Sequence, residues 1–479
     1  MIRPSRRPTT TAQLMRHGIN TPQTIAALAV LGLFACGSLM VMQDDSWWHL
    51  RCGELIWRTG TVPDRDPFSF TLPAEAHWPN HEWLAQVLFF GLYSLGGLPL
   101  LNLLGGVVMA LTGAFLLAAM RGPMERRFAL LMLALPWMIS SLSVRPQIFT
   151  LLGLALTLHC LARRRYWPLP LVFLVWANLH GAVSIGGAVL VVAAIVQAAI
   201  GPLRSIPILI ATALSGAATL VTPMGFELLL FPLESVARLR VLGLTEWMPP
   251  GITQWQDLYF WLLLAGFLGI AALRGSRVRR VSTAQTIAAA GLLAILSAMS
   301  ARNIPLFLMA AAVATSRMFP IHADVRSDRP ARKNLAVAGV FTGATFGALA
   351  FAFVMPLKRL DWEPLRREAI AAIRETPGPM FNTYNTGGYL LWFVPERPVF
   401  VDSRQDPYPI DFLVELTHAQ RTGDPGTLFD RFRLRSALLE RHWPLVKTLR
   451  DLGWSTRYAD DRWVILSAEP DGRRLAATR

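Results

Sequence analysis

Long charge-free runs occupy the first three-quarters of the chain and alternate with short charged segments. A membrane-spanning helix needs about 20 mostly apolar residues. Runs of this kind predict eleven spans, at 22–42, 97–120, 128–144, 146–162, two within 166–203, 206–222, 256–273, 282–300, 304–317 and 335–357. The uncharged segment 83–95 predicts a helix lying in the interface. The first run follows four arginines and lacks a small-residue cleavage site, so we interpret it as an anchor rather than a signal peptide.

The last quarter of the chain has a different pattern, with many charges and no long apolar run. An amphipathic helix is predicted over 361–375, ending at Thr376-Pro377-Gly378. Beyond it, short apolar runs alternate with helical stretches, which is typical of a small α/β domain. The apolar runs are 380–381, 398–401, 436–439 and 463–466, and the helical stretches are 388–393, 410–417 and 443–452. We therefore expect a helical transmembrane domain over 1–357 and a soluble α/β domain over 358–479.

The net charge of +15 records the orientation of the chain in the membrane. With 53% hydrophobic and only 16% charged residues, the 479-residue chain is neither a soluble nucleic-acid binder nor a disordered polycation. If the N-terminus lies inside, the inner segments carry 20 Lys and Arg and three acids, whereas the outer loops carry seven and eleven. This asymmetry follows the positive-inside rule. An odd number of spans then places the soluble domain outside, and no nucleic-acid partner is expected.

The first outer loop, 43–82, is the most informative segment for function. It holds seven acids and four of the 16 tryptophans, and residues 46–58 have the spacing of an amphipathic helix on the membrane surface. An interfacial aromatic belt explains most of the tryptophans. It explains Asp44 and Asp45 less well, because a carboxylate where a span meets the interface is costly. We expect one of these two acids to be functional.

Two arginines lie on the acidic side, against the trend that places cations inside. Arg145 is at the outer tip of a tight hairpin, and Arg302 is at the outer end of another span. Each could be an interfacial arginine whose charge reaches water, but finding both beside the acids favours phosphate binding. His180, near the middle of the 166–203 hairpin, could orient a phosphate or could cap a helix.

Several other polar residues are candidates for the same site. His49, His81 and Glu82 could bind a divalent cation, Mg or Mn, together with Asp45, although their spacing matches no standard metal motif. No cofactor is therefore assigned, and the metal site stays open. Glu82 could instead be a second acid that positions an acceptor. In the soluble domain, Arg404 follows an apolar run and could contact the acceptor or a lipid headgroup, or form a salt bridge between domains.

Short motifs spread over most of the chain carry a resemblance. They are Asp45-Ser46-Trp47-Trp48-His49-Leu50, Pro63-x-x-Asp66-Pro67-Phe68-Ser69, His81-Glu82-Trp83-Leu84, Arg145-Pro146-Gln147, Trp176-Ala177-Asn178-Leu179-His180-Gly181, Glu246-Trp247, Arg302-Asn303-Ile304-Pro305, Gly387-Gly388-Tyr389-Leu390 and Val401-Asp402-Ser403-Arg404. In this order they resemble landmarks of bacterial membrane proteins in the GT-C glycosyltransferase superfamily. Each motif alone is weak, and the order and spacing together are more specific. The resemblance is mainly one of architecture, so the sugar and the acceptor do not carry over.

The resemblance implies a membrane enzyme that takes a sugar from a polyprenyl-phosphate donor, with its catalytic acid in the first outer loop. By that resemblance Asp45 is the candidate base, and Asp44 is the alternative because the acidic pair can be aligned either way. Asp66, within the second motif, joins the candidates for substrate binding. A carboxylate would take the proton of an acceptor hydroxyl as it attacks the anomeric carbon, and a single base without a covalent intermediate would give inversion. Cations would stabilise the departing lipid phosphate.

The expected protein is thus a multi-pass enzyme of a bacterial inner membrane, with its active site on the extracytoplasmic side among membrane lipids. Its acceptor would be a glycan, a lipid or a protein. A transporter or flippase of a lipid-linked substrate is the main alternative, although such proteins usually carry ionisable groups near the midplane and internal repeats. A non-catalytic membrane scaffold is the third alternative, and it would not require Asp44, Asp45 or Arg145.

Overall fold

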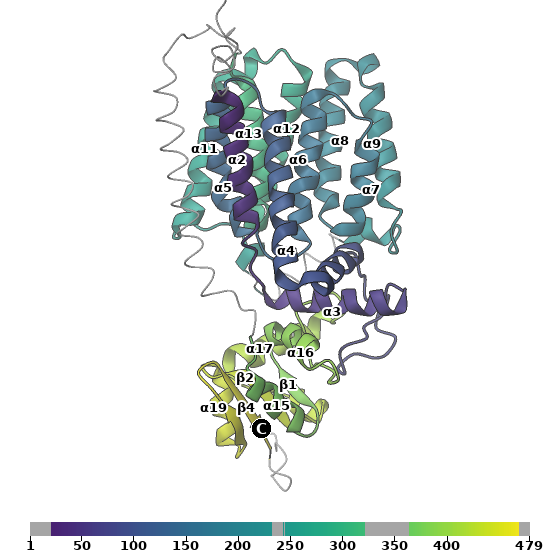
Figure 1. The fold of residues 1–479 in the computed structure, drawn as a ribbon, viewed down its shortest axis with the longest axis vertical. Coiled ribbons are helices and arrows are strands. Elements are labelled where there is room, and N and C mark those ends of the chain that lie inside the picture. Colours follow the sequence, from purple (N-terminus) through teal and green to yellow (C-terminus); the bar gives the residue numbers. More distant parts are fainter. Residues whose placement is uncertain (1–20, 232–242, 244, 321–363, 469–479) are drawn as a thin grey trace, which may run out of the picture.

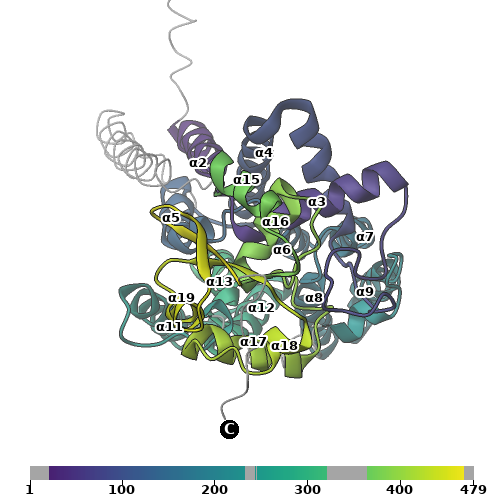
Figure 2. The same cartoon turned by 90° about the horizontal axis from the view of Figure 1, so that it is seen from below.

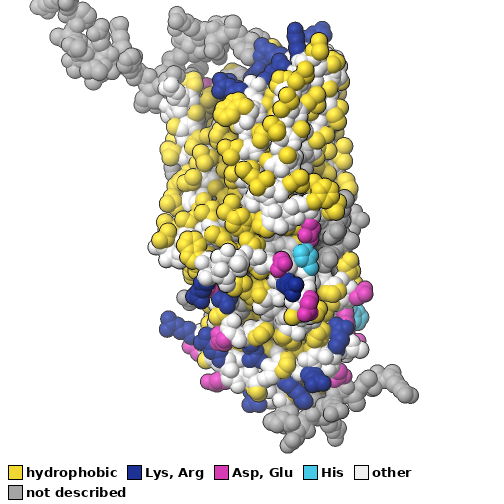
Figure 3. Space-filling model, turned by 90° about the vertical axis from the view of Figure 1, so that its right-hand side faces the viewer, with side chains coloured by type: hydrophobic (Ala, Val, Ile, Leu, Met, Phe, Trp, Pro, Cys, Tyr) yellow, Lys and Arg dark blue, Asp and Glu magenta, His cyan; other side chains and the backbone are white. Residues whose placement is uncertain are grey.

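The computed structural model of the chain describes residues 21–231, 243, 245–320 and 364–468. Its helices form an elongated bundle, one helix lies across an end of that bundle, and the α/β domain sits beyond this helix (Figure 1). Hydrophobic side chains cover the sides of the bundle, Lys and Arg gather at the end far from the α/β domain, and charges of both signs are mixed over the α/β domain (Figure 3). This distribution is that of a membrane protein whose two ends face water.

The helices of the bundle follow the apolar runs of the sequence. They are α2 (Thr21–Gly37), α4 (Trp83–Ala119), α5 (Met124–Ser140), α6 (Gln147–Arg163), α7 (Leu169–Leu179), α8 (Val183–Ile200), α9 (Ile206–Thr219), α11 (Trp255–Arg274), α12 (Val281–Met299) and α13 (Ile304–Met318). Among the described residues, four helices are long and apolar enough to cross a membrane, namely α4, α8, α11 and α12. Other apolar helices, such as α7 and α9, are shorter, because prolines and glycines interrupt the runs. The predicted count of eleven spans is therefore not confirmed, and the span predicted at 335–357 lies outside the described residues.

Helix α4 contains the predicted change from an interfacial to a spanning helix. Its backbone leaves the helical region at Gly96 and Gly97, and Pro99 follows directly. Gly97 has a φ of +64°, a conformation that favours glycine because it has no Cβ. The chain thus turns between 83–95 and the spanning part of α4, and Figure 1 shows the resulting bend.

Hydrogen bonds show which helix ends meet at each end of the bundle. At the basic end, the Arg317 guanidinium donates to the carbonyl oxygens of Ala119 and Ala162 and to the Ser282 hydroxyl, at 2.9, 2.9 and 2.7 Å. The ends of α4, α6 and α13 and the start of α12 therefore meet here. At the other end, the α5–α6 and α7–α8 connections and the start of α13 surround one cavity.

Helix α3 (Asp44–Thr59) lies across the cavity end of the bundle, as Figure 1 shows. It begins two residues before the predicted amphipathic helix and buries Trp47, Trp48 and Leu50. Gln43 caps it through a reciprocal pair of hydrogen bonds with Ser46. Asp44 and Asp45 occupy its first turn, where carboxylates interact favourably with the helix dipole.

The α/β domain contains a mixed four-stranded sheet in the order β1-β2-β4-β3. Strand β1 (Met380–Asn382) runs parallel to β2 (Ser436–Glu440), and β4 (Trp463–Ser467) is antiparallel to both β2 and β3 (Ser455–Ala459). The helices around it are α15 (Arg367–Glu375), α16 (Gly387–Phe393), α17 (Ile410–Thr422), α18 (Leu428–Arg431) and α19 (Pro444–Asp451). Three of the predicted apolar runs form strands, whereas β3 was not predicted because its residues are mostly polar and solvent-facing. The proposed domain boundary at 357/358 lies outside the described residues.

The predicted strand at 398–401 joins the first outer loop instead of this sheet. The Val399 amide donates to the Phe68 carbonyl at 3.0 Å, and the Phe70 amide donates to the Val399 carbonyl at 3.1 Å. The Thr71 hydroxyl also donates to the Phe400 carbonyl at 2.7 Å. These hydrogen bonds join the α/β domain to the first outer loop, which contains α3. A view from below shows the α/β domain covering the cavity end of the bundle (Figure 2).

Candidate functional site

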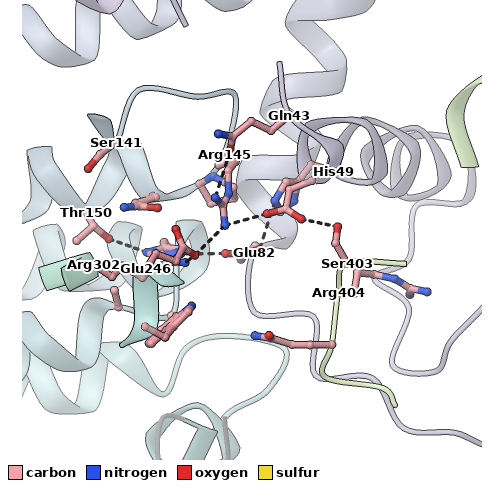
Figure 4. A pocket seen from close by; sticks show the side chains of 18 of the residues that line it. Gln43, His49, Glu82, Ser141, Arg145, Thr150, Glu246, Arg302, Ser403 and Arg404 are labelled. Atoms are coloured by element: carbon pink, nitrogen blue, oxygen red, sulfur yellow. Dashed lines mark hydrogen bonds and ion pairs between the residues drawn. The ribbon is translucent and has the colours of Figure 1, made fainter. Parts of the chain in front are cut away.

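A cavity of about 760 Å³ lies where the bundle, helix α3 and the α/β domain meet. The bundle contributes the α5–α6 and α7–α8 connections and the start of α13, and the α/β domain contributes the loop after Val401. The sequence-predicted residues on its wall are Asp44, Asp45, His49, His81, Glu82, Arg145, His180, Arg302 and Arg404. Segments far apart in the chain therefore bring acids, arginines and imidazoles together (Figure 4).

The two adjacent acids of α3 have different surroundings. The Asp45 carboxylate forms an ion pair with Arg145 at 2.8 Å and accepts hydrogen bonds from the Ser403 hydroxyl and, at 3.3 Å, from Trp48 Nε1. Although burial opposes its ionisation, Arg145 and Ser403 hold the pKa of Asp45 below its ordinary value. Burial and the neighbouring charge of Asp45 raise the pKa of Asp44 to about 7. The pair thus holds one firmly ionised carboxylate and one that titrates near neutrality.

The two arginines converge on one carboxylate. Arg302 forms an ion pair with Glu246 and lies over the Trp247 ring at 4.7 Å, while Arg145 approaches the same Glu246 at 3.7 Å. Arg145 also donates to the Gln43 side chain at 3.2 Å. Burial lowers the pKa of Arg302 below its ordinary value, although the charge of Glu246 acts to raise it. Two guanidiniums at a single cavity wall form a site suited to a phosphate.

Three imidazoles surround the carboxylate of Glu82. The Nε2 atoms of His81, His180 and His49 lie 3.5, 3.4 and 3.7 Å from its oxygens. Burial lowers the pKa of His49 to about 4 and that of His180 to about 3. His81 differs: despite its burial, the charge of Glu82 raises its pKa to about 9. At neutral pH the cluster therefore contains an imidazolium–carboxylate pair and two neutral imidazoles.

The contacts of His180 favour the tautomer that carries its proton on Nε2. Its Nδ1 lies 2.7 Å from the Thr150 hydroxyl, which accepts a hydrogen bond from Trp176 Nε1 at 3.1 Å. When the Thr150 hydroxyl donates to Nδ1, the proton of the neutral ring is on Nε2, facing Glu82. The residues of α6 and α7 thus orient His180 toward the cavity.

Two adjacent glycines allow close backbone packing here, Gly388 against α3 and Gly387 against the loop after Val401. A Cβ on Gly388 would lie 2.2 Å from the Asp44 carbonyl oxygen, and one on Gly387 would lie 2.1 Å from the Val401 carbonyl oxygen. Helix α16 therefore rests directly on the helix that carries the acidic pair. The Tyr384 hydroxyl donates to the Ser403 carbonyl at 2.7 Å and so holds the loop whose hydroxyl contacts Asp45.

Arg404 is part of the cavity wall, but its charge is paired with Asp66 and Asp402, and Asp66 does not line the cavity. The Arg404 guanidinium donates to Asp66 and to Asp402, each at 2.6 Å, and the side chains of Arg404 and Asp66 are both 0% exposed. The guanidinium also lies over the rings of Trp78 and Phe68, at 4.4 and 4.9 Å. Figure 4 shows Arg404 directed away from the cavity, although Ser403 beside it points inward. Asp66, Asp402 and Arg404 therefore form a buried ion-pair cluster that joins the first outer loop to the α/β domain. The predicted role of Asp66 and Arg404 in substrate binding stays a prediction.

The divalent cation stays a prediction. Within the part of the chain that the structure describes, no three His, Cys, Asp or Glu side chains are arranged to hold a metal ion. His49, His81 and Glu82 do lie together, but Asp45 is engaged by Arg145 instead. The protonated His81 already balances the charge of Glu82, which reduces the attraction of this cluster for a cation.

Sequence reasoning gave no role to Glu246, Ser403 or Thr150. Glu246 was noted only as part of a motif, and its link to two arginines depends on tertiary contacts. Ser403 meets Asp45 across 358 positions of sequence. Thr150 is one of several hydroxyls in an apolar helix, so nothing in the local pattern distinguishes it.

Comparisons with known proteins show the fold. No family model and no curated protein sequence matches the chain. Among solved structures, it is similar to the archaeal oligosaccharyltransferase AglB from Archaeoglobus fulgidus in complex with an inhibitory peptide and a dolichol-phosphate, with a TM-score of 0.55 and 10% identity over 88% of this chain and 69% of that chain. A second structure is the Archaeoglobus fulgidus oligosaccharyltransferase tethered to an acceptor peptide containing the NVT sequon, with a TM-score of 0.55, 11% identity and the same coverage. The chain thus shares the fold of these two oligosaccharyltransferase structures, and these archaeal neighbours do not support a bacterial origin.

Proposed function

We propose that the chain is a membrane glycosyltransferase that moves a sugar from a polyprenyl-phosphate donor to an acceptor. One observation carries the proposal: an acidic pair and two arginines from distant segments face one cavity at the end of a membrane bundle. Sugar transfer from a lipid phosphate needs a base for the acceptor and cations for the leaving group, side by side at the membrane boundary. The similarity of the fold to that of AglB supports the proposed glycosyltransferase activity.

We assign the base to Asp44. A general base works best when its pKa lies near the working pH, and the pKa of Asp44 is about 7. Asp44 takes the proton of the acceptor as the acceptor atom forms its bond to the anomeric carbon. The bond from that carbon to the phosphate oxygen breaks, and the lipid phosphate leaves with the electron pair. Asp45, ionised and held by Arg145 and Ser403, stabilises the positive charge that develops on the sugar.

Arg145 and Arg302 bind the phosphate in this scheme. Both guanidiniums share Glu246, whose side chain is 40% exposed. The donor phosphate is a diester with one negative charge, and it gains a second charge as its bond to the sugar breaks, so its attraction to the two guanidiniums grows during the reaction. Donor binding therefore replaces the contacts of Glu246, and the negative charge that grows on the leaving oxygen stays next to two cations.

The Glu82 cluster is placed to orient the acceptor. Glu82 is ionised at neutral pH, since the charge of His81 holds its pKa below the ordinary value in spite of burial.

The structures of AglB contain an acceptor peptide or an inhibitory peptide, which favours a protein acceptor over a glycan or a lipid. The excess of arginine at the opposite end favours an extracytoplasmic cavity.

The proposal is tested by a transfer assay in lipid nanodiscs. Full-length protein is incubated with radiolabelled polyprenyl-phosphate sugars and a panel of peptide, glycan and lipid acceptors. We expect wild type to transfer label and Asp44→Asn to lose at least a hundredfold in rate, as removal of a general base does. The matched control is Asp64→Asn, an exposed acid of the same loop, which should keep the wild-type rate. Movement of an intact lipid-linked sugar across the bilayer without transfer to any acceptor would show a transporter instead.

A further inference from the structure

The end of the bundle opposite the cavity carries a concentration of positive charge. Six arginines from different helix ends lie there: Arg121, Arg126, Arg127, Arg163, Arg274 and Arg280. None of them forms an ion pair with a carboxylate among the described residues, where Glu125 is the one acid at this end. Like charges gathered without counter-charges repel each other, so this end favours an anionic ligand.

Some of these arginines have structural partners. Arg163 donates twice to the Ala118 carbonyl, at 3.2 and 2.8 Å, and Arg127 donates to the Leu117 carbonyl at 3.4 Å and to the Gly122 carbonyl at 2.8 Å. Basic side chains at the carbonyl end of a helix are a standard form of capping, and α4 ends here. Capping therefore accounts for the positions of these two side chains.

Capping does not account for Arg126 and Arg274. Arg126 is in the first turn of α5 and Arg274 is the last residue of α11, yet both guanidiniums lie over the Phe319 ring, at 5.2 and 4.3 Å from its centre. The Nε of Arg126 is buried and has no hydrogen-bond partner, and its Nη2 makes only a long contact of 3.4 Å to a carbonyl. Two cations are thus held together around one aromatic ring, with a donor left unused.

We propose that Arg126 and Arg274 bind the phosphate headgroup of an anionic phospholipid at the end of the bundle opposite the cavity. A phosphodiester bridging the two guanidiniums supplies the missing counter-charge. The location favours a lipid over a soluble anion, because the basic end directly adjoins the apolar sides of the bundle (Figure 3). On α11 itself Leu273 is 75% and Leu268 is 54% exposed, which leaves apolar surface next to Arg274 for the acyl chains.

The test is lipid binding by the purified full-length chain, measured by native mass spectrometry in neutral detergent. Phosphatidylglycerol is the anionic probe and phosphatidylcholine the zwitterionic one. Each of Arg126→Gln and Arg274→Gln should weaken phosphatidylglycerol binding about fivefold, and the double variant more than tenfold. Binding of phosphatidylcholine should not change. Arg204→Gln, at an exposed arginine of the short helix Pro202–Arg204, is the matched control and should stay within twofold of wild type.

Two results would overturn the inference. The first is equal phosphatidylglycerol binding by wild type and the double variant. The second is displacement of the lipid by millimolar inorganic phosphate, which would identify a site for a soluble anion. Arg126→Lys keeps the charge and protects against a folding artefact: it should retain more binding than Arg126→Gln, and equal losses in both would also count against the site.

Discussion

Replacing Asp45 by Asn should move the titration of Asp44 to lower pH. In the wild type, burial and the charge of Asp45 together place the pKa of Asp44 at about 7. A neighbouring unit charge contributes on the order of 2 kcal/mol at an effective dielectric constant of about 20, which corresponds to a pKa change of about 1.5. The substitution also releases Arg145 from its 2.8 Å ion pair, and this cation then acts on Asp44 in the same direction. We expect the pKa of Asp44 in Asp45→Asn to fall to between about 5 and 6.

Infrared difference spectroscopy measures this titration without a substrate. The wild-type spectrum should show a protonated carboxyl group that ionises near pH 7, and Asp44→Asn should abolish this signal. In Asp45→Asn the signal should persist at lower pH. The transfer rate should follow, since a base is active only when ionised: the rate rises through pH 7 in wild type and already below pH 6 in Asp45→Asn. A carboxyl signal near pH 7 that survives in Asp44→Asn, or that does not move in Asp45→Asn, would refute the reasoning.

Three further predictions concern the buried ion pairs of Arg404, the contact between α16 and α3, and the imidazoles around Glu82. Arg404→Met leaves buried carboxylates without their partner, so it should destabilise the protein by about 3–5 kcal/mol, measured by thermal unfolding. Gly388→Ala places a Cβ 2.2 Å from the Asp44 carbonyl oxygen and should cost about 1–3 kcal/mol by forcing α16 away from α3, with a loss of transfer activity. Glu82→Gln removes the charge that raises the pKa of His81 to about 9, so NMR should show this imidazole titrating below its ordinary pKa of 6.5.

Each of these variants has a control in the chain. Arg374→Met removes a half-exposed arginine whose pair with Glu396 is open to solvent, and it should change stability by less than about 1 kcal/mol. Gly216→Ala adds a Cβ where no atom lies within 4 Å, so it should be tolerated. Glu54→Gln should leave the titration of His81 unchanged. A control that behaves like its partner variant would show a general loss of structure instead of the local effect.

Sequence patterns predicted local structure better than contacts between distant segments. The division of α4 near residue 96 was predicted because the charge-free run is too long for one span, and the structure places the break at Gly96 and Gly97. Helix α3 was predicted from the amphipathic spacing of residues 46–58. Strand β3 was not, since its residues are polar and its pairing with β4 is decided by the rest of the sheet.

The site shows the same division. Asp44 and Asp45 could be selected because carboxylates at the interface are costly, and Arg145 and Arg302 because they lie on the acidic side; the structure places all four on one cavity. Their catalytic and binding roles stay predictions. The neighbours Ser403 and Arg404 could not be told apart by sequence, because only the direction of each side chain in the folded loop sends one to Asp45 and the other to Asp66.

The contact between Ser403 and Asp45 has a consequence for biosynthesis. The two residues are 358 positions apart, and a ribosome adding about 5–20 residues per second needs roughly 20–70 s to cover that distance. During this interval the nascent chain already exposes its acidic pair, but the wall formed by the α/β domain does not yet exist. The cavity is therefore completed only by the last part of the chain to be made, and a product truncated before residue 403 would carry the acids without the surroundings that tune them.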